Sequence, residues 1–120
     1  DKTVPKGTPI SYGATFRTRR PSRIATIPIG YADGWARANS NNGAALVRGR
    51  RCPIVGRVTM DMTMLDVTDA PQARVGDDAV LIGAQGAVEI GARDVAQRTG
   101  TIPYEVVCAI STRVPRVYLS

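Results

Sequence analysis

The stretch NNGAALVRGRRCPIVGRVT, residues 41–59, decides the fold. Asn42-Gly43 is a strong tight-turn signal, because both residue types tolerate the backbone angles that such turns require. The apolar run over 44–47 predicts a strand, and Gly49-Arg50 predicts a hairpin turn into a second strand over 51–59. Two short strands joined by so tight a turn indicate antiparallel β-structure.

Further short strands are predicted on both sides of this hairpin. They carry alternating or β-branched residues, and turn residues bound them. The clearest case is 62–67, where Met, Thr, Met, Leu, Asp and Val follow one another in the pattern of a half-buried strand. The predicted strands outside the hairpin are 9–18, 22–30, 62–67, 78–83 and 113–119, and 31–43 is predicted as a loop.

The sequence also predicts one helix and leaves a second segment open. Over 91–99, small and apolar residues recur at i, i+3, i+4 and i+7, and Gly100 provides a stop signal. A second short helix is expected to begin at Pro103, with a strand over 106–110 as the alternative. Many short strands separated by Gly and Pro turns predict a mainly β fold, namely a small barrel-like β domain with one or two short helices.

Length and composition limit what this chain can be. Its 120 residues fit one domain over 1–120, and 43% hydrophobic residues indicate a globular protein. No apolar run reaches the about 20 residues that span a bilayer, and the polar start does not resemble an export signal, so we expect a cytoplasmic protein. Cys52 and Cys108 lie among apolar neighbours and are expected to be reduced packing residues. Without histidine or a CxxC pair, we expect no metal site.

The net charge of +6 makes nucleic acid a partner to consider. All but two of the 16 basic residues are arginines, and most of them are scattered along the chain. Aromatic residues make up only 5%, which is poor for stacking on bases. A basic β-barrel that binds nucleic acid is therefore a weak alternative, and we expect an arginine-rich solvated surface instead.

Few residues are suited to catalysis. The lack of histidine excludes Ser-His and Cys-His nucleophile pairs, and no glycine-rich phosphate loop precedes a lysine. Four tyrosines remain, and two of them, Tyr12 and Tyr31, adjoin a glycine that permits close approach of a ligand or chain. A tyrosine can act as an acid or base when nearby positive charge lowers its pKa from about 10. An ordinary rim residue is the other interpretation of each tyrosine.

Four motifs in order resemble one known family. They are ISYG at 10–13, GYADGWAR at 30–37, GRVTMDM at 56–62, and TIPYEVVC at 101–108 followed by RVPR at 113–116. Together they cover nearly the whole chain, and they resemble the C-terminal β-domain of pyridoxal-phosphate-dependent alanine racemases. In that family an N-terminal (β/α)8 barrel precedes this domain.

The resemblance implies a reaction. Members interconvert L- and D-alanine, a step toward peptidoglycan precursors, on pyridoxal 5'-phosphate, which drains charge from the α-carbon. One base is the lysine that also forms the Schiff base, and it belongs to the barrel, which these residues do not include. The other base is the tyrosine of the SYG motif, which corresponds to Tyr12.

Other roles carry over from the resemblance position by position. Tyr104 corresponds to a tyrosine that hydrogen-bonds the cofactor phosphate, and Pro103 stands where Asn is common. Met60 and Asp61 correspond to the substrate-binding pair, Met60 through its backbone N–H. The residues expected at the substrate entrance are Tyr31, Arg37 and Arg57. Ordinary structural roles are expected for four others: strand packing for Met62 and Met64, turn bonding for Asp33, and packing for Trp35.

The resemblance also implies partners. The family forms a head-to-tail homodimer in which Tyr12, Tyr31 and Met60 serve the partner subunit's cofactor, while Tyr104 serves its own subunit's. The expected partner of this domain is the barrel of its own enzyme, the expected substrate is alanine, and neither nucleic acid nor membrane is expected. The chain alone is predicted to be inactive. A serine or broad-specificity racemase remains an alternative; a group IV decarboxylase is disfavoured, because neither cysteine lies in a CxSxD-type motif.

Overall fold

The computed structural model describes residues 2–10 and 16–117. Its helices and strands follow one another in the order β1 Lys2–Val4, β2 Pro9–Ile10, β3 Phe16–Arg17, β4 Ser22–Ile27, η2 Tyr31–Asp33, η3 Arg37–Asn39, β5 Ala44–Val47, β6 Arg50–Pro53, β7 Thr63–Asp66, β8 Ala79–Val80, β9 Gly83–Gln85, β10 Val88–Ile90, α1 Ala92–Thr99 and α2 Pro103–Cys108. The described part of the chain is therefore mainly β with two short helices, which confirms the predicted class.

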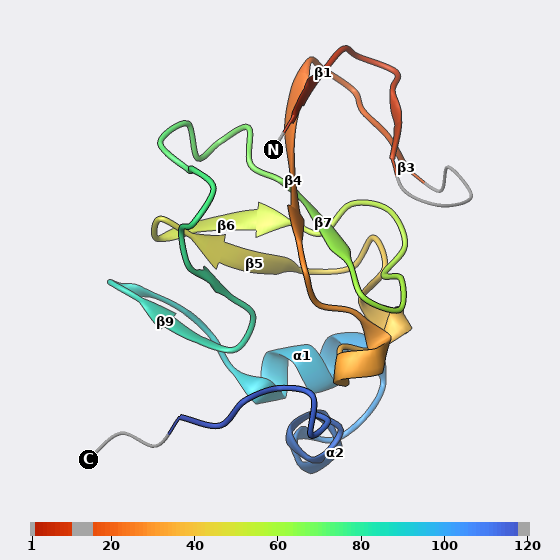
Figure 1. Cartoon of the computed structure of the whole chain (residues 1–120), viewed down its shortest axis with the longest axis vertical. Coiled ribbons are helices and arrows are strands. Elements are labelled where there is room, and N and C mark those ends of the chain that lie inside the picture. Colours follow the sequence, from red (N-terminus) through yellow and green to blue (C-terminus); the bar gives the residue numbers. More distant parts are fainter. Residues whose placement is uncertain (1, 11–15, 118–120) are drawn as a thin grey trace.

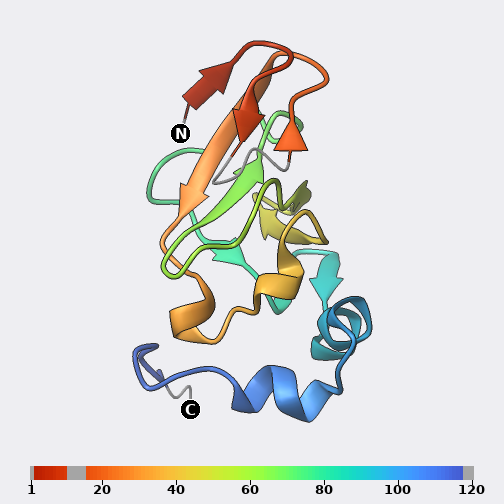
Figure 2. The same ribbon diagram turned by 90° about the vertical axis from the view of Figure 1, so that its right-hand side faces the viewer.

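The strands form small antiparallel sheets that stack along the molecule. The two largest have the orders β1-β4-β7 and β6-β5-β8, and β2-β3 and β10-β9 are separate hairpins. None of these sheets closes on itself within the described ranges. Figures 1 and 2 show the β1–β3 end and the α1–α2 end at opposite ends of the molecule, with the β5–β6 hairpin between them.

The hairpin that the sequence indicated is present. β5 pairs with β6 in antiparallel register, with Val47 opposite Arg50, so the turn is Arg48-Gly49, one residue earlier than the predicted Gly49-Arg50, and Arg50 already belongs to β6. Both turn residues have positive φ, 53° at Arg48 and 73° at Gly49, as a two-residue turn between twisted strands requires. The predicted second strand was too long, because pairing ends at Pro53 and only a single bridge, Ile54 to Leu65, continues it.

Two buried clusters hold the sheets together. The larger one combines both central sheets with α1, and Leu46, Leu65 and Val95 are almost fully buried in it. The smaller one joins β1, β2 and β4 around Ile24 and Val55. Burying each such side chain contributes roughly 2 kcal/mol, so the site loops rest on a formed core.

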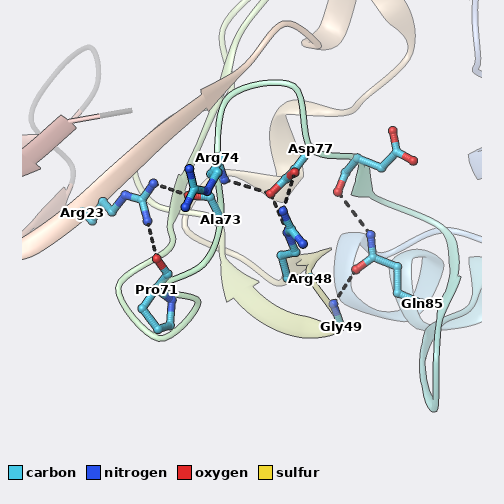
Figure 3. A network of polar contacts seen from close by, with 9 residues as sticks. Arg23, Arg48, Gly49, Pro71, Ala73, Arg74, Asp77 and Gln85 are labelled. Carbon is cyan, nitrogen blue, oxygen red and sulfur yellow. Dashed lines mark hydrogen bonds and ion pairs between the residues drawn. The ribbon is translucent and has the colours of Figure 1, made fainter.

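The loop between β7 and β8 is held by polar contacts instead (Figure 3). The Arg48 guanidinium donates to both carboxylate oxygens of Asp77, at 2.8 and 3.1 Å, and Arg23 donates to the carbonyls of Pro71 and Ala73. Gln85 connects the β5–β6 turn to Asp78. The strand predicted over 78–83 is divided: β8 covers only Ala79–Val80, and β9 begins at Gly83.

The strand predicted over 113–119 is wrong for its described part, 113–117, which forms a turn and an irregular tail. The Arg116 guanidinium donates to the carbonyls of Ile110, Ser111 and Val114 at 2.6 to 2.9 Å. Arg116 thus satisfies two carbonyls just before the tail and one within it without a neighbouring strand.

Candidate functional site

The η2 segment lies against the turn that carries Met60 and Asp61. The Tyr31 N–H donates to the Thr59 carbonyl at 3.0 Å, and the Ala32 N–H donates to the Met60 carbonyl at 2.9 Å. Gly30 makes this approach possible, because a Cβ there would lie 2.1 Å from the Thr59 oxygen. The side chains of Tyr31 and Met60 are 48% and 53% exposed, so the two residues lie in adjoining backbone segments at the surface.

The Met60–Asp61 turn is closed by Thr59 and Met62. The Thr59 N–H donates to the Met62 carbonyl at 3.0 Å, and the Met62 N–H donates to the Thr59 Oγ1 at 3.1 Å. Within the described residues, nothing accepts a hydrogen bond from the N–H of Met60 or of Asp61. Met60 is an exposed residue of this turn, and an N–H with no acceptor among the described residues is suited to binding an anionic oxygen.

Most of the ordinary roles expected near this turn are observed. Asp33 accepts a hydrogen bond from the Gly30 N–H at 3.0 Å, and Trp35 is 5% exposed in the core. Met64 is half-buried against the smaller cluster. The packing role expected for Met62 is wrong, since its side chain is 43% exposed: it follows the turn before β7 begins and belongs to the surface.

The segments that carry Arg37 and Arg57 lie side by side. Arg37 opens η3, and the residues just after η3 reach the backbone on each side of Arg57. The Ser40 Oγ accepts the Val58 N–H at 2.8 Å, and the Asn41 Oδ1 accepts the Gly56 N–H at 2.6 Å. Arg37 is exposed and Arg57 is half-buried. The sequence identified both arginines but treated Ser40 and Asn41 only as loop residues.

Tyr104 lies in the first turn of α2, where its side chain is 81% exposed. The helix begins at Pro103, as predicted from the preference of proline for the first helical position, and the alternative strand over 106–110 is wrong because α2 continues to Cys108. A hollow of about 360 Å³ lies between α2, α1 and the η3 segment. No described hydrogen bond joins Tyr104 to Tyr31 or to Met60.

The segment after α2 connects that helix to η2. The Ser111 N–H donates to the Asp33 carbonyl at 3.0 Å, and the Arg113 guanidinium lies 3.4 Å from the Asp33 carboxylate. Gly34 has a φ of 99°, and a Cβ there would lie 2.1 Å from the Ala109 carbonyl oxygen. Loop 30–34 is therefore enclosed between the Met60 turn and the tail.

Tyr12, the candidate base, lies outside the described residues, in the sequence between β2 and β3.

The two cysteines differ in exposure. Cys52 is buried, and burial raises the pKa of its thiol. Cys108 is exposed, so the packing role expected for it is wrong in this domain. Among the residues that the structure places, no group of His, Cys, Asp or Glu could hold a metal ion. None of the helices there is long and apolar enough to cross a membrane.

Comparison with known proteins places this arrangement among enzyme domains. Alanine racemase from Halothermothrix orenii is 60% identical over 117 residues, which cover 98% of this chain and 31% of that protein. The crystal structure of alanine racemase from Bacillus anthracis with bound L-Ala-P superimposes with a TM-score of 0.89 at 46% identity, over 99% of this chain and 30% of that one. The Bartonella henselae enzyme with covalently bound pyridoxal phosphate gives 0.86 at 37% identity, over 98% and 32%.

Fold and comparisons thus define a β-domain similar to one part of these enzymes. Residues 1–118 match the family described as "Alanine racemase, C-terminal domain". The chain belongs to this family. It spans 31% of the length of the Halothermothrix relative.

Proposed function

We propose that this domain supplies one side of the active site of a pyridoxal-phosphate-dependent racemase that interconverts L- and D-alanine for peptidoglycan precursors. The observation that carries the proposal is the Met60–Asp61 turn. Two hydrogen bonds from η2 hold this turn beside Tyr31, and among the described residues no acceptor binds the Met60 or Asp61 N–H. Such N–H groups suit the carboxylate of an amino acid, and Asp61 lies next to them.

The arginines near this turn suit the same substrate. Arg37 and Arg57 are carried by two segments that Ser40 and Asn41 hold together. Positive charge along an entrance raises the local concentration of a carboxylate. Tyr31, Arg37 and Arg57 would line the entrance, and Met60 would bind the carboxylate through its N–H.

The chain's residues fit one end of the cofactor. The exposed phenol of Tyr104 is a hydrogen-bond donor suited to the phosphate of pyridoxal phosphate. The only lysines, Lys2 and Lys6, are exposed near β1, far in the fold from α2 in Figure 1. Pyridoxal phosphate, when bound, withdraws charge from the substrate's α-carbon. The amine that holds it would come from the N-terminal barrel of the enzyme.

Tyr12 would act as the base on one face of the substrate. Its phenol oxygen would take the proton from the α-carbon in one direction and return it in the other. In a head-to-tail homodimer, Tyr12, Tyr31 and Met60 would face the partner subunit's cofactor, and Tyr104 its own subunit's. The bacterial cytoplasm is the proposed location, which the two free cysteines support.

A complementation titration tests this function. The 120-residue chain is mixed with the purified N-terminal barrel of the same enzyme and pyridoxal phosphate, and D-alanine formed from L-alanine is measured. We expect activity only on mixing. Tyr12→Phe should lower kcat by about 10² to 10⁴-fold, the usual contribution of a general base.

Tyr31→Phe is the matched control, because it also removes one phenol oxygen but from a residue assigned to the entrance. We expect it to change KM more than kcat. Association without any activity would contradict the proposed reaction, and an unchanged kcat in Tyr12→Phe would contradict the role of Tyr12. If the separate parts do not associate, the same two variants are compared in the full-length enzyme.

A further inference from the structure

Arg98, in the last turn of α1, lies against the loop that follows η3. Its side chain is partly buried, and this burial lowers the pKa of the guanidinium, while Asp94 one turn earlier opposes the shift. A Cβ added to Gly43 would lie 2.2 Å from the Arg98 Cζ, so the guanidinium packs directly on the Gly43 backbone. The Nε atom is buried and has no hydrogen-bond partner among the described residues.

Two asparagines attach Arg98 to both ends of the segment 39–42. The Arg98 Nη2 donates to the Asn39 Oδ1 at 2.9 Å, and Asn39 is 1% exposed. The Asn42 Nδ2 donates to the Arg98 carbonyl at 2.9 Å and to the Ala38 carbonyl at 3.0 Å. The guanidinium therefore forms its hydrogen bond with an amide deep in the fold, and no described carboxylate forms an ion pair with it.

The middle of the same segment holds the backbone around Arg57. Ser40 and Asn41 accept the N–H groups of Val58 and Gly56, and the Asn41 N–H donates to the Gly56 carbonyl at 3.0 Å. Arg37 belongs to η3, which ends at Asn39. A continuous set of contacts thus runs from α1 through 39–42 to both arginines of the proposed entrance.

We propose that Arg98 is a positioning residue that fixes Arg37 and Arg57 relative to each other, and so sets how the enzyme recognises the substrate carboxylate. The identity of the substrate in this inference rests on the proposed function. The positions of the two arginines rest on the contacts described above. This role requires an arginine, because its planar guanidinium can stack on Gly43 and donate to Asn39 at the same time. A lysine has neither a planar group nor donors in fixed directions.

The kinetic test uses the full-length holoenzyme with Arg98→Ala. Arg93→Ala is the matched control, because it removes the same charge from an exposed position on the same helix. We expect Arg98→Ala to raise KM for alanine about tenfold, equivalent to about 1.4 kcal/mol, with kcat within about twofold. Arg93→Ala should leave both constants unchanged.

A double-mutant cycle separates positioning from general damage. If Arg98 acts through the entrance arginines, Arg98→Ala should have little further effect on kcat/KM once Arg37→Ala and Arg57→Ala are present. If Arg98→Ala lowers kcat/KM as much in the variant that lacks both entrance arginines as in the wild type, the proposal is overturned. A fall in kcat at constant KM, or an Arg93→Ala effect as large as that of Arg98→Ala, would also overturn it.

Amide hydrogen exchange in the full-length protein gives a readout that needs no activity. Arg98→Ala should speed exchange of the Gly56 and Val58 amides, and Arg93→Ala should not. If Arg98→Ala does not fold, Ser40→Ala, which removes only the bond to Val58, should raise KM in the same direction by a smaller factor. If the wild-type enzyme does not racemise alanine, the proposed function fails, and the exchange result alone decides whether Arg98 orders these segments.

Discussion

The η2 segment and α2 both carry proposed site residues, but they are held in different ways. Backbone hydrogen bonds fix η2 to the Met60 turn, and the side chain of Asp33 within it is only 12% exposed. α2 contains no buried residue, and Tyr104 and Val107 are 81% and 56% exposed. One region is organised by contacts inside the domain, whereas the other presents side chains outward.

The difference between η2 and α2 indicates which half of the proposed site this domain can arrange without another chain. The hydrogen bonds to the Thr59 and Met60 carbonyls lie within this domain, so the arrangement of the proposed substrate side needs no other chain. Val106 of α2 packs partly against the larger cluster, whereas Tyr104 and Val107 would become buried only against another surface. That surface, in the function we propose, is the barrel of the enzyme.

The largest expected effect is at Gly34, where the two regions meet. Gly34 and Gly100 both end helices with positive φ, 99° and 77°, so an alanine costs about 1 kcal/mol of backbone strain at either position. Only at Gly34 would the new Cβ also overlap the Ala109 carbonyl, which adds about 1–3 kcal/mol. Urea unfolding of Gly34→Ala and Gly100→Ala measures the difference. Equal losses would mean that the tail is not held against η2.

A smaller effect is expected at Asp33, which holds η2 in shape. Asp33→Ala removes a charge-assisted hydrogen bond from the Gly30 N–H and should cost about 1.5–3 kcal/mol of unfolding free energy. Arg113→Ala removes only the exposed ion pair to the same carboxylate and should cost under about 1 kcal/mol. Thermal unfolding compares the two, and a larger loss in Arg113→Ala would contradict this order.

A pH-dependent effect is expected at the β7–β8 loop, away from both regions. The hydrogen bond from Arg48 and that from the Arg74 N–H lower the pKa of Asp77. A carboxyl with a lowered folded-state pKa contributes stability above its unfolded pKa of about 3.9, and loses it as pH falls through the folded value. The urea midpoint of wild type should therefore exceed that of Asp77→Asn at neutral pH, and the gap should shrink below about pH 4. If the difference in urea midpoint between the two proteins does not change with pH, the ionised Asp77 carboxylate is not its cause.

The smallest effect on stability is expected in α2. Val107→Ser alters a surface side chain and should change the unfolding free energy of the domain by less than about 0.5 kcal/mol. Val95→Ser in α1, where Val95 is 2% exposed, should be strongly destabilising. In the mixing experiment, Val107→Ser should weaken association with the barrel. An unaltered affinity would show that α2 does not face that partner.

Local sequence signals predicted the elements whose cause is local. The turn near Asn42-Gly43 and the β5–β6 turn were predictable because Gly43 and Gly49 readily adopt positive φ, although the second turn lies one residue earlier than predicted. Helix α1 was predictable because its spacing and Gly100 match a capped helix. The β9–β10 hairpin was missed, since the three-residue strands on either side of its turn at Gly86 are too short for alternation to be recognised. The tail strand was predicted wrongly because Arg116, which satisfies the carbonyls there, has no local signal.

The site divides in the same way. Sequence alone determined the identity of Tyr31, Arg37, Arg57, Met60 and Tyr104 as candidates, because motifs preserve residue type and order. Only the tertiary structure decided that η2 lies on the Met60 turn and that Arg98, on a distant helix, touches the loop between the two arginines. Contacts between residues 59 positions apart, as from Asn39 to Arg98, depend on how the core brings the sheets and α1 together, and no local pattern encodes them.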